Sequence, residues 1–312
     1  MQLVPWSEVG LDAAHAVVEG VQRADGIPFV TTREEIGEWA DEPHFDPATD
    51  AVVAVVDDAV VGWAMASHSP SGERLERVHL HGGVLPDHRG LGIGSTLLEW
   101  QLARGRERLA GYEHGLPKYI RTWEYDFQTE AHQLFEDHGL VPVRWFEELI
   151  RPVGMIEATT DIEIVPWQPE HSAAVLPVKN AAFADHWGST PTDAETWDVW
   201  MGAANTRLDL SFVAIDGGEV VGFALNGHYP ADEEILGRKD GWIESLGVSR
   251  SHRGRGIASA LIAASVAAFA DAGFDCAMLG VDSANPTGAR GLYERLGFEP
   301  LHRAVTHELV VS

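Results

Sequence analysis

The chain is short of cysteine and of lysine. Cys276 is its only cysteine, which excludes a disulfide within the chain and a zinc site built from several thiolates. Three lysines, Lys118, Lys179 and Lys239, leave 19 arginines among the 22 basic residues, so arginine or backbone amides would have to hold a bound anion. Membrane-length apolar runs are lacking, and the first residues have no basic and apolar regions typical of a signal peptide. We therefore expect a cytoplasmic protein without membrane contact.

Positive charge is scarce relative to negative charge. The 22 basic residues face 48 acidic ones, which gives a formal net charge of -26. Such a chain repels a phosphate backbone wherever the charge is not locally reversed, so nucleic acid is excluded as an expected partner. Hydrophobic residues make up 45% of the 312 residues, which is enough for packed cores, and the length favours two domains.

Short motifs recur in the same order in the two halves of the chain. Several matches with nearly constant spacing indicate a duplication, because isolated chance matches would not keep their order. We therefore predict two tandem copies of one domain, covering residues 1–152 and 162–312. The matching positions, with their spacings in parentheses, are Val4 and Val165 (161), Val60 and Val220 (160), His68 and His228 (160), His88 and His252 (164), and Gly139 and Gly297 (158).

Each copy is expected to have the α+β fold class, with a mixed, mostly antiparallel sheet flanked by helices. Paired apolar runs separated by turn residues predict a hairpin in each copy, and a further strand leads into a loop rich in arginine and glycine. That loop opens a helix, because Ile257, Leu261, Ile262, Val266 and Phe269 recur at helical spacing. The predicted strands are 51–56, 60–66, 78–85 and 118–125 in the first copy, and 210–215, 220–225, 242–248 and 274–281 in the second.

The loop between strand and helix is suited to binding an anion. Glycines let phosphate approach the backbone, and the first N–H groups of a helix lack partners within the helix. An ordinary glycine-rich turn is the alternative, but the loop occurs twice in matching contexts. The dinucleotide motif and the Walker lysine are both absent, which disfavours nicotinamide, flavin and ATP. The loop residues are Arg89, Gly90, Gly92 and Gly94 in the first copy and Arg253, Gly254, Arg255, Gly256, Ile257 and Ala258 in the second.

Three stretches of the second copy together resemble the coenzyme-A signature of GNAT acetyltransferases. They are residues 247–258, residues 281–286 and residues 291–298. The first copy has the same layout with a weaker end, so the resemblance covers nearly the whole chain. The tandem arrangement and residues 184–188 (Ala-Asp-His-Trp-Gly) resemble the two-domain actinobacterial branch that includes mycothiol synthases.

The resemblance implies acetyl-CoA as co-substrate and assigns roles to individual residues. Backbone amides from Arg253 to Ala258 would hold the pyrophosphate, and a break between two strands would admit the pantetheine arm along Leu246, Gly247 and Val248. Tyr293 would protonate the departing thiolate, and Asn285 would hydrogen-bond the arm or an ordered water.

Glu244 is the candidate general base. Strand alternation puts Trp242, Glu244 and Leu246 on one face, just before the loop. Burial there would raise the pKa of the carboxyl toward the working pH, as a base acting on an ammonium requires. The family's glutamate aligns at Trp242, so Glu244 is a substitute on the same face. A solvent-facing or arginine-paired strand residue is the alternative.

The first copy lacks these polar groups. Leu80, Phe127 and Phe135 align with Glu244, Asn285 and Tyr293, so we expect the first domain to bind CoA at most and to be catalytically degenerate. Alternatively, His79, His81 or Tyr125 has taken over the chemistry. His79 and His81 share a strand face, but a third ligand is lacking, so no metal is expected. Cys276 is expected to be a buried filler.

The leading hypothesis is an acetyl-CoA-dependent N-acetyltransferase. It would move an acetyl group to a primary amine of a small molecule by direct attack in a ternary complex, and a mycothiol-synthase-like acceptor is the candidate. A non-catalytic CoA-binding sensor or regulatory module is the alternative. Trp187, Trp197 and Trp200 would line an acceptor cleft or pack in the core. The protein is expected to be a monomer or homodimer.

Overall fold

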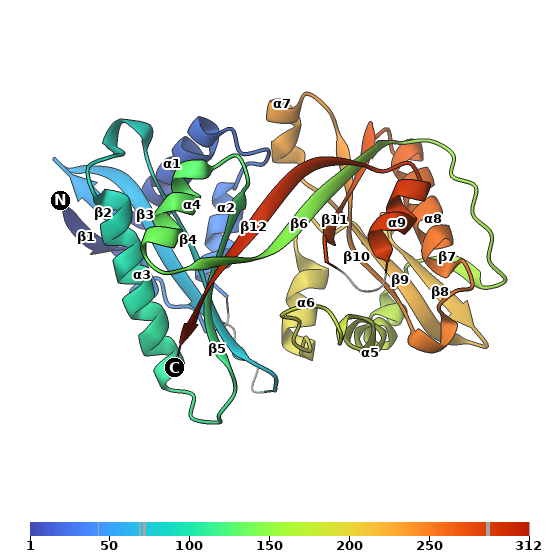
Figure 1. Cartoon of the computed structure of the whole chain (residues 1–312). Coiled ribbons are helices and arrows are strands. Elements are labelled where there is room, and N and C mark those ends of the chain that lie inside the picture. The colour runs from blue at the N-terminus through green and yellow to red at the C-terminus, as the bar shows by residue number, and fades with distance from the viewer. Residues whose placement is uncertain (43, 69, 71–72, 285–287, 312) are drawn as a thin grey trace. The chain divides into compact units, whose positions relative to one another are not determined.

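The computed structural model describes residues 1–42, 44–68, 70, 73–284 and 288–311 (Figure 1). The chain forms two compact units. Unit 1 consists of Met1–Arg144 and Ala304–Ser312, and unit 2 consists of Trp145–Arg303. No helix in the described part of the chain is both long and apolar enough to cross a membrane.

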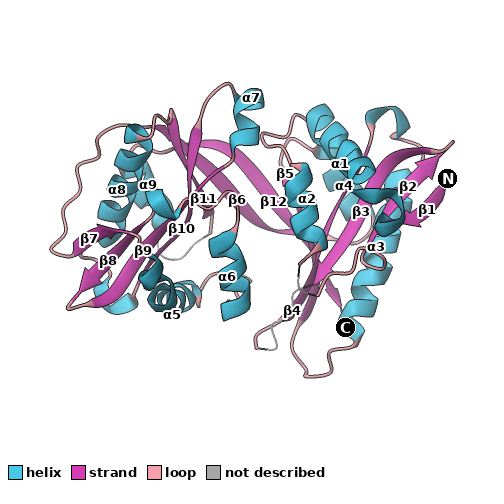
Figure 2. Cartoon of the chain, turned by 180° about the vertical axis from the view of Figure 1, so that it is seen from behind, coloured by secondary structure: helices cyan, strands magenta, loops and turns pink. Residues whose placement is uncertain are grey.

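Unit 1 is a mixed sheet covered by helices (Figure 2). Its strands follow the order β1, β2, β3, β4, β5, β12, and neighbours are antiparallel except β4 and β5. The predicted hairpin is the pair β2 and β3. The elements are β1 (Gln2–Pro5), α1 (Trp6–Asp25), α2 (Arg33–Ala40), β2 (Ala51–Val56), β3 (Ala59–His68), β4 (Glu76–Val84), α3 (Ile93–Ala110), β5 (Lys118–Tyr125), α4 (Thr129–Asp137) and the end of β12 (Glu299–Val311).

Unit 2 repeats this plan. Its strands follow the order β6, β11, β10, β9, β8, β7, and β10 and β11 are the parallel pair. The α+β class with a mixed, mostly antiparallel sheet is thereby confirmed. The elements are β6 (Val141–Pro152), β7 (Glu163–Pro166), α5 (Ser172–Phe183), α6 (Ala194–Gly202), β8 (Phe212–Asp216), β9 (Glu219–His228), α7 (Glu233–Leu236), β10 (Asp240–Val248), α8 (Ile257–Asp271), β11 (Cys276–Asp282) and α9 (Ala289–Arg295).

The terminal strands of the two sequence halves are exchanged. β6 ends the first half, but from Phe146 to Pro152 it pairs antiparallel with β11 of unit 2. β12 ends the second half, but from Ala304 to Val311 it pairs antiparallel with β5 of unit 1. The helices and strands before each terminal strand fall in the same unit as the predicted ranges 1–152 and 162–312 place them. The prediction is wrong for the terminal strands, because β6 completes the sheet of unit 2 and β12 completes the sheet of unit 1. Each exchanged strand covers a sheet edge that would otherwise present unpaired N–H and C=O groups.

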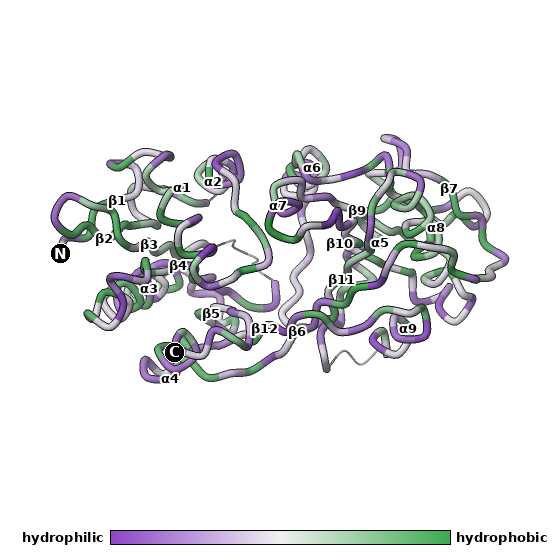
Figure 3. Tube along the Cα trace, turned by 90° about the horizontal axis from the view of Figure 1, so that it is seen from above, coloured by the Kyte–Doolittle hydropathy of each residue, from purple (hydrophilic) through white to green (hydrophobic). Residues whose placement is uncertain are grey.

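Helices pack on both faces of each sheet. In unit 2 the five residues that predicted helix α8 are all buried against the sheet, in a core shared with α9. The opposite face packs against α5 and α6 through a separate cluster that contains Trp197 and Phe223. In unit 1, α1 and α2 cover one face and α3 covers the other. Hydrophobic residues follow β2, β3 and α8 in Figure 3, as this layered packing requires.

Candidate active site

The predicted anion loop has the same backbone form in both units. A short 3-10 turn follows the strand, and two glycines with positive φ lead into the helix. These angles are 72° and 80° at Gly90 and Gly92, and 79° and 77° at Gly254 and Gly256. L side chains rarely adopt this conformation, so glycine is needed to turn the chain into α3 and α8. The first N–H groups of both helices are thereby presented at the end of a strand, where an anion is favoured.

The arginine that begins each loop supports the loop rather than reaching outward. Arg253 donates through Nε to the Val248 carbonyl at 3.3 Å and through Nη2 to the Ala182 carbonyl of α5 at 3.3 Å. In unit 1, Arg89 donates through Nε to the Val84 carbonyl at 2.8 Å and pairs with Asp25 of α1 at 2.6 Å. These bonds tie each loop to its strand and to a helix of the opposite layer.

The chain between the two sequence halves packs on the loop of unit 2. Arg255 pairs with Asp161 at 2.5 Å and with Asp216 at 2.9 Å, and these carboxylates raise the pKa of its guanidinium. A Cβ added at Gly256 would collide with the carbonyl oxygen of Thr159. Gly256 is therefore required both by its φ and by this contact.

The two parallel strands separate beside each loop. Among the described residues, β10 and β11 pair from Asp240 to Ile243 on one strand and from Cys276 to Leu279 on the other. β10 continues to Val248 paired only with β9, so backbone groups of Leu246 to Val248 face the gap. β4 and β5 separate in the same way, after His79 and Arg121. The break predicted between the strands 242–248 and 274–281 corresponds to this separation in unit 2, and unit 1 has an equivalent separation.

A β-bulge at Glu244 changes the predicted geometry of β10. Ile243 lies opposite Asn226 of β9, but Ser245 lies opposite Leu225, so Glu244 is an extra residue in the strand. Ile243 and Leu246 consequently both contact the α8 core, and the prediction that Leu246 shares a face with Glu244 is wrong. A bulge of this kind re-aims a side chain and is common beside active sites.

The bulge also changes how the two units correspond. In unit 1, Leu80 lies opposite Ala66 and His81 opposite Met65 without a register shift. Leu80 therefore corresponds to the core residue Ile243, and the predicted match of Leu80 with Glu244 is wrong. The β4 strand of unit 1 has no counterpart of Glu244 in this register.

Glu244 is open to water, yet protein surrounds its carboxyl on most sides. The resulting loss of hydration raises the pKa of Glu244; the charge of Glu148 adds to the rise, and a hydrogen bond from Tyr229 opposes it. The side chain lies across Gly227 of β9, where an added Cβ would be 2.8 Å from Glu244 Oε1. Neither Tyr229 nor Glu148 was predicted from the sequence. Glu148 could not be found because nothing in the sequence indicates that β6 pairs with β11 of unit 2.

Tyr293 lies in α9, buried in the α8 and α9 core with its ring against Phe298. Burial raises its pKa to about 12, so it holds its proton at neutral pH, as a general acid must. Tyr293 and Phe135 occupy equivalent positions in the two units. The Phe298 N–H donates a hydrogen bond to the Tyr293 carbonyl, and the Leu140 N–H donates one to the Phe135 carbonyl in the same way. Asn285 lies outside the described residues.

Residues 184–188 lie beside the loop of unit 2. Asp185 pairs with Arg250 of the 3-10 turn, and the ring of Trp187 lies 6.4 Å from that of Phe146 on β6. Burial lowers the pKa of His186, which also responds to the charges of Asp282 and Arg253. Trp197 packs in the α5 and α6 core, whereas Trp200 remains partly exposed.

A pocket of about 750 Å³ follows the gap in unit 1. The predicted cofactor residues Arg89, Gly90, Gly92 and Gly94 all line it, together with Glu124 at the end of β5. His81 also lines it; burial lowers the pKa of this imidazole to about 4, which keeps it neutral. No group of three metal-ligating side chains occurs in the part of the chain that the structure describes.

Glu124 gives a testable dependence of stability on pH. Burial, with a contribution from Asp25, raises its pKa from 4.5 to about 8 against an opposing hydrogen bond from Gln128. The folded protein then holds a proton that the unfolded chain releases, so this residue costs stability as pH rises from about 5 to 8. We expect Glu124→Gln to gain stability relative to the parent by up to about 1.4 kcal/mol per pH unit in that window. Urea unfolding of both proteins at several pH values measures this, and a constant difference would contradict it.

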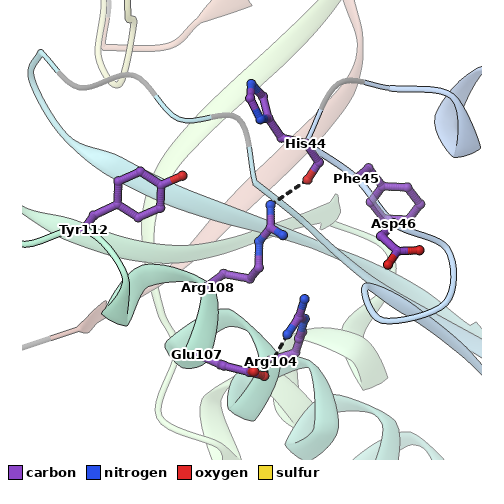
Figure 4. Close-up of a pocket in the computed structure, with 7 residues that line it drawn as sticks. All are labelled: His44, Phe45, Asp46, Arg104, Glu107, Arg108 and Tyr112. Atoms are coloured by element: carbon purple, nitrogen blue, oxygen red, sulfur yellow. Dashed lines mark hydrogen bonds and ion pairs between the residues drawn. The ribbon is translucent and has the colours of Figure 1, made fainter.

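A second pocket in unit 1, of about 570 Å³, is lined by Arg104, Arg108 and Tyr112 and by residues 44–46 (Figure 4). Arg104 pairs with Asp50 at 2.8 Å and with Glu107 at 2.8 Å. Arg108 donates to the His44 carbonyl at 2.6 Å and lies 3.4 Å from Asp50. Both guanidinium groups are thus already paired with oxygen, so this pocket is a poor site for a phosphate.

Comparison with known proteins agrees with this geometry. The chain matches the acetyltransferase (GNAT) family over residues 18–140 and 172–298, once in each half. It is 30% identical over 250 residues to a mycothiol acetyltransferase of Thermobispora bispora, covering 77% of each chain. It is 31% identical over 273 residues to a mycothiol acetyltransferase of Salinispora arenicola, covering 82% of this chain and 80% of that one.

Solved structures show the same two-domain architecture. A GCN5-related N-acetyltransferase from Sphaerobacter thermophilus superposes with a TM-score of 0.78 at 25% identity, over 99% of this chain and 95% of that one. A tandem GNAT protein from the clavulanic acid biosynthesis pathway has a TM-score of 0.69 at 16% identity, over 99% and 98% of the two chains, and shows the shared fold. The chain therefore belongs to the GNAT acetyltransferase family and is an acyltransferase with tandem GNAT regions that uses acetyl-CoA as co-substrate.

Proposed function

We propose that unit 2 transfers the acetyl group of acetyl-CoA to a primary amine of a small molecule. The observation that carries this proposal is the bulge that presents Glu244 beside the gap between β10 and β11, in the same unit as Tyr293 and the α8 loop. Unit 1 has a comparable loop and gap, but it has Phe135 in place of Tyr293 and lacks the bulge. We propose that unit 1 binds CoA at most and is catalytically degenerate.

In unit 2 the backbone amides from Arg253 to Ala258 hold the pyrophosphate, and Leu246, Gly247 and Val248 line the pantetheine arm. Asn285 belongs to the proposed site through the motif alone. Starting from an ammonium, the chemistry then needs two protons removed from the acceptor nitrogen, one before and one after attack, and one proton delivered to sulfur.

Glu244, directly or through water, takes a proton from the acceptor ammonium. The neutral nitrogen attacks the thioester carbonyl carbon and forms a C–N bond, which leaves a positive charge on the nitrogen. The nitrogen then loses a second proton to solvent water, and the C–S bond breaks as the tetrahedral intermediate collapses. The Tyr293 hydroxyl gives its proton to the departing sulfur and is reprotonated from solvent. The products are the acetamide and free CoA.

Mycothiol synthesis supplies the candidate acceptor. Two relatives similar over more than three quarters of the chain are mycothiol acetyltransferases, and their acceptor class is proposed for this chain by that similarity. A CoA-binding sensor without turnover is the alternative. The single cysteine supports work in a reducing cytoplasm, as a monomer or homodimer, and the net charge of -26 disfavours nucleic acid.

An amine panel tests the proposal. Acetyl-CoA consumption is measured with small primary amines that include the cysteinyl precursor of mycothiol, and mass spectrometry identifies the product. We expect at least one amine to be acetylated with a turnover number above about 1 s⁻¹, the lower end for typical enzymes. Tight acetyl-CoA binding without acetylation of any amine on the panel would favour the sensor.

A further inference from the structure

The strand exchange brings an acidic side chain from the first sequence half into unit 2. Leu149 of β6 lies opposite Leu279 and packs in the α8 core. Because side chains alternate along a strand, Glu148 faces the other side of the sheet, where α5 and α6 pack. Glu148 lies opposite Gly280, and a Cβ added at Gly280 would meet no atom of the described residues within 4 Å. Among the described residues, space is therefore open over Gly280, beside Glu148, on that face.

Glu244 occupies the same face of the sheet. Its neighbour Ile243 points into the α8 core, and its own carboxyl lies across Gly227 of β9. Glu148 is close enough that its charge acts on the ionisation of Glu244. The two carboxyls thus approach each other from β6 and β10. On β11, which lies between these strands, the residue opposite Glu148 is Gly280, which has no side chain to separate them.

Aromatic residues accompany the two carboxyls. Phe146 lies two residues before Glu148, hence on the same face, and its ring lies 6.4 Å from that of Trp187. Tyr229 donates a hydrogen bond to Glu244. A small molecule beside the end of the β10 and β11 pairing would meet negative charge together with aromatic surface, which suits an organic cation.

We propose that Glu148 is a specificity-determining residue that binds the ammonium group of the acceptor next to Glu244. This inference rests on the proposed function, because it assigns the substrate class of the same site. Two carboxylates divide the work: Glu148 holds the cation in place, and Glu244 receives the proton that must leave before attack. The acceptor class is therefore small molecules whose amine is protonated in solution, and neutral isosteres are rejected.

Glu148→Gln tests this role, with Glu147→Gln as the matched control. Glu147 carries the same charge one residue earlier on β6, but it faces α9 and lies 3.2 Å from Arg290. We expect Glu148→Gln to raise the KM for the amine at least tenfold, with the KM for acetyl-CoA within twofold and kcat changed much less. Glu147→Gln should leave the KM for the amine within about threefold. Equal changes in both KM values, or an unchanged KM for the amine, would overturn the proposal.

A binding measurement separates this inference from the proposed function. Calorimetry with cysteine amide, and with the isostere in which a hydroxyl replaces the amine, needs no turnover. We expect the parent protein to prefer the amine at least tenfold and Glu148→Gln to lose that preference, while thermal melting confirms that the variant is folded. Equal affinity of the parent for the two compounds would sink the role of Glu148. Amine preference without acetylation of any amine would instead refute the proposed transfer and leave Glu148 as a cation-binding residue.

Discussion

Ala258→Glu is expected to abolish acetyl-CoA binding in unit 2 and to reduce turnover at least 100-fold. Ala258 is the second residue of α8, directly after the loop proposed to hold the pyrophosphate. A carboxylate there repels the phosphates and competes for the same N–H groups. The helix dipole favours a negative charge in the first turn, so the fold should not suffer. Calorimetry with acetyl-CoA and a steady-state assay measure the two effects.

Gly94→Glu is the matched control in unit 1. Gly94 is the second residue of α3, and an added Cβ would touch Leu134 Cδ2 at an ordinary 3.4 Å. We expect this variant to keep at least half of the parent turnover, even if it removes a second CoA from the chain. A substitution at Gly256 would be a poor test, because a side chain there would be strained by the positive φ and would collide with the Thr159 carbonyl, which would disturb the fold. Inactive Gly94→Glu beside active Ala258→Glu would place catalysis in unit 1.

Tyr293→Phe should lower kcat by about 10²- to 10⁴-fold, as loss of a general acid does, while the affinity for acetyl-CoA stays nearly constant. The change removes only a hydroxyl from a buried ring, and the contact with Phe298 is kept. Single-turnover kinetics and calorimetry separate chemistry from binding. Full activity in Tyr293→Phe would show that another group protonates the thiolate.

The same substitution at Tyr125 provides the control. Tyr125 is a buried tyrosine of unit 1, at the end of β5, and it was an alternative catalyst on sequence grounds. We expect Tyr125→Phe to retain activity within about threefold. If kcat fell sharply in Tyr125→Phe and stayed unchanged in Tyr293→Phe, the general acid would be Tyr125 of unit 1.

Local signals were sufficient for the inner elements of each unit. The glycine loop could be recognised from the sequence because its backbone needs glycine at Gly254 and Gly256, where φ is positive, and because an apolar helix follows it. The hairpins follow from strand-length apolar runs with a turn between them. The sheet class and the unequal residues at Phe135 and Tyr293 could therefore be predicted before the structure was known.

Two features escaped prediction because they depend on pairing rather than on local pattern. The spacing between the halves grows from 160 at His68 and His228 to 164 at His88 and His252, but the sequence does not show where the extra residues lie. The structure puts one of them at Glu244 as a bulge. The strand that pairs with β6 could not be predicted either. The two duplicated sheets have equivalent edges, at β5 and at β11, and either terminal strand could pair with either edge.

The exchange of β6 and β12 also bears on how this gene can evolve. After duplication, two self-contained copies could have been lost or separated independently. Here, deleting the first copy would remove the strand that pairs with β11, and deleting the second would remove the strand that pairs with β5. Selection that preserves either sheet thus maintains both copies, and splitting the gene between them would yield two products that each lack a strand of their own sheet.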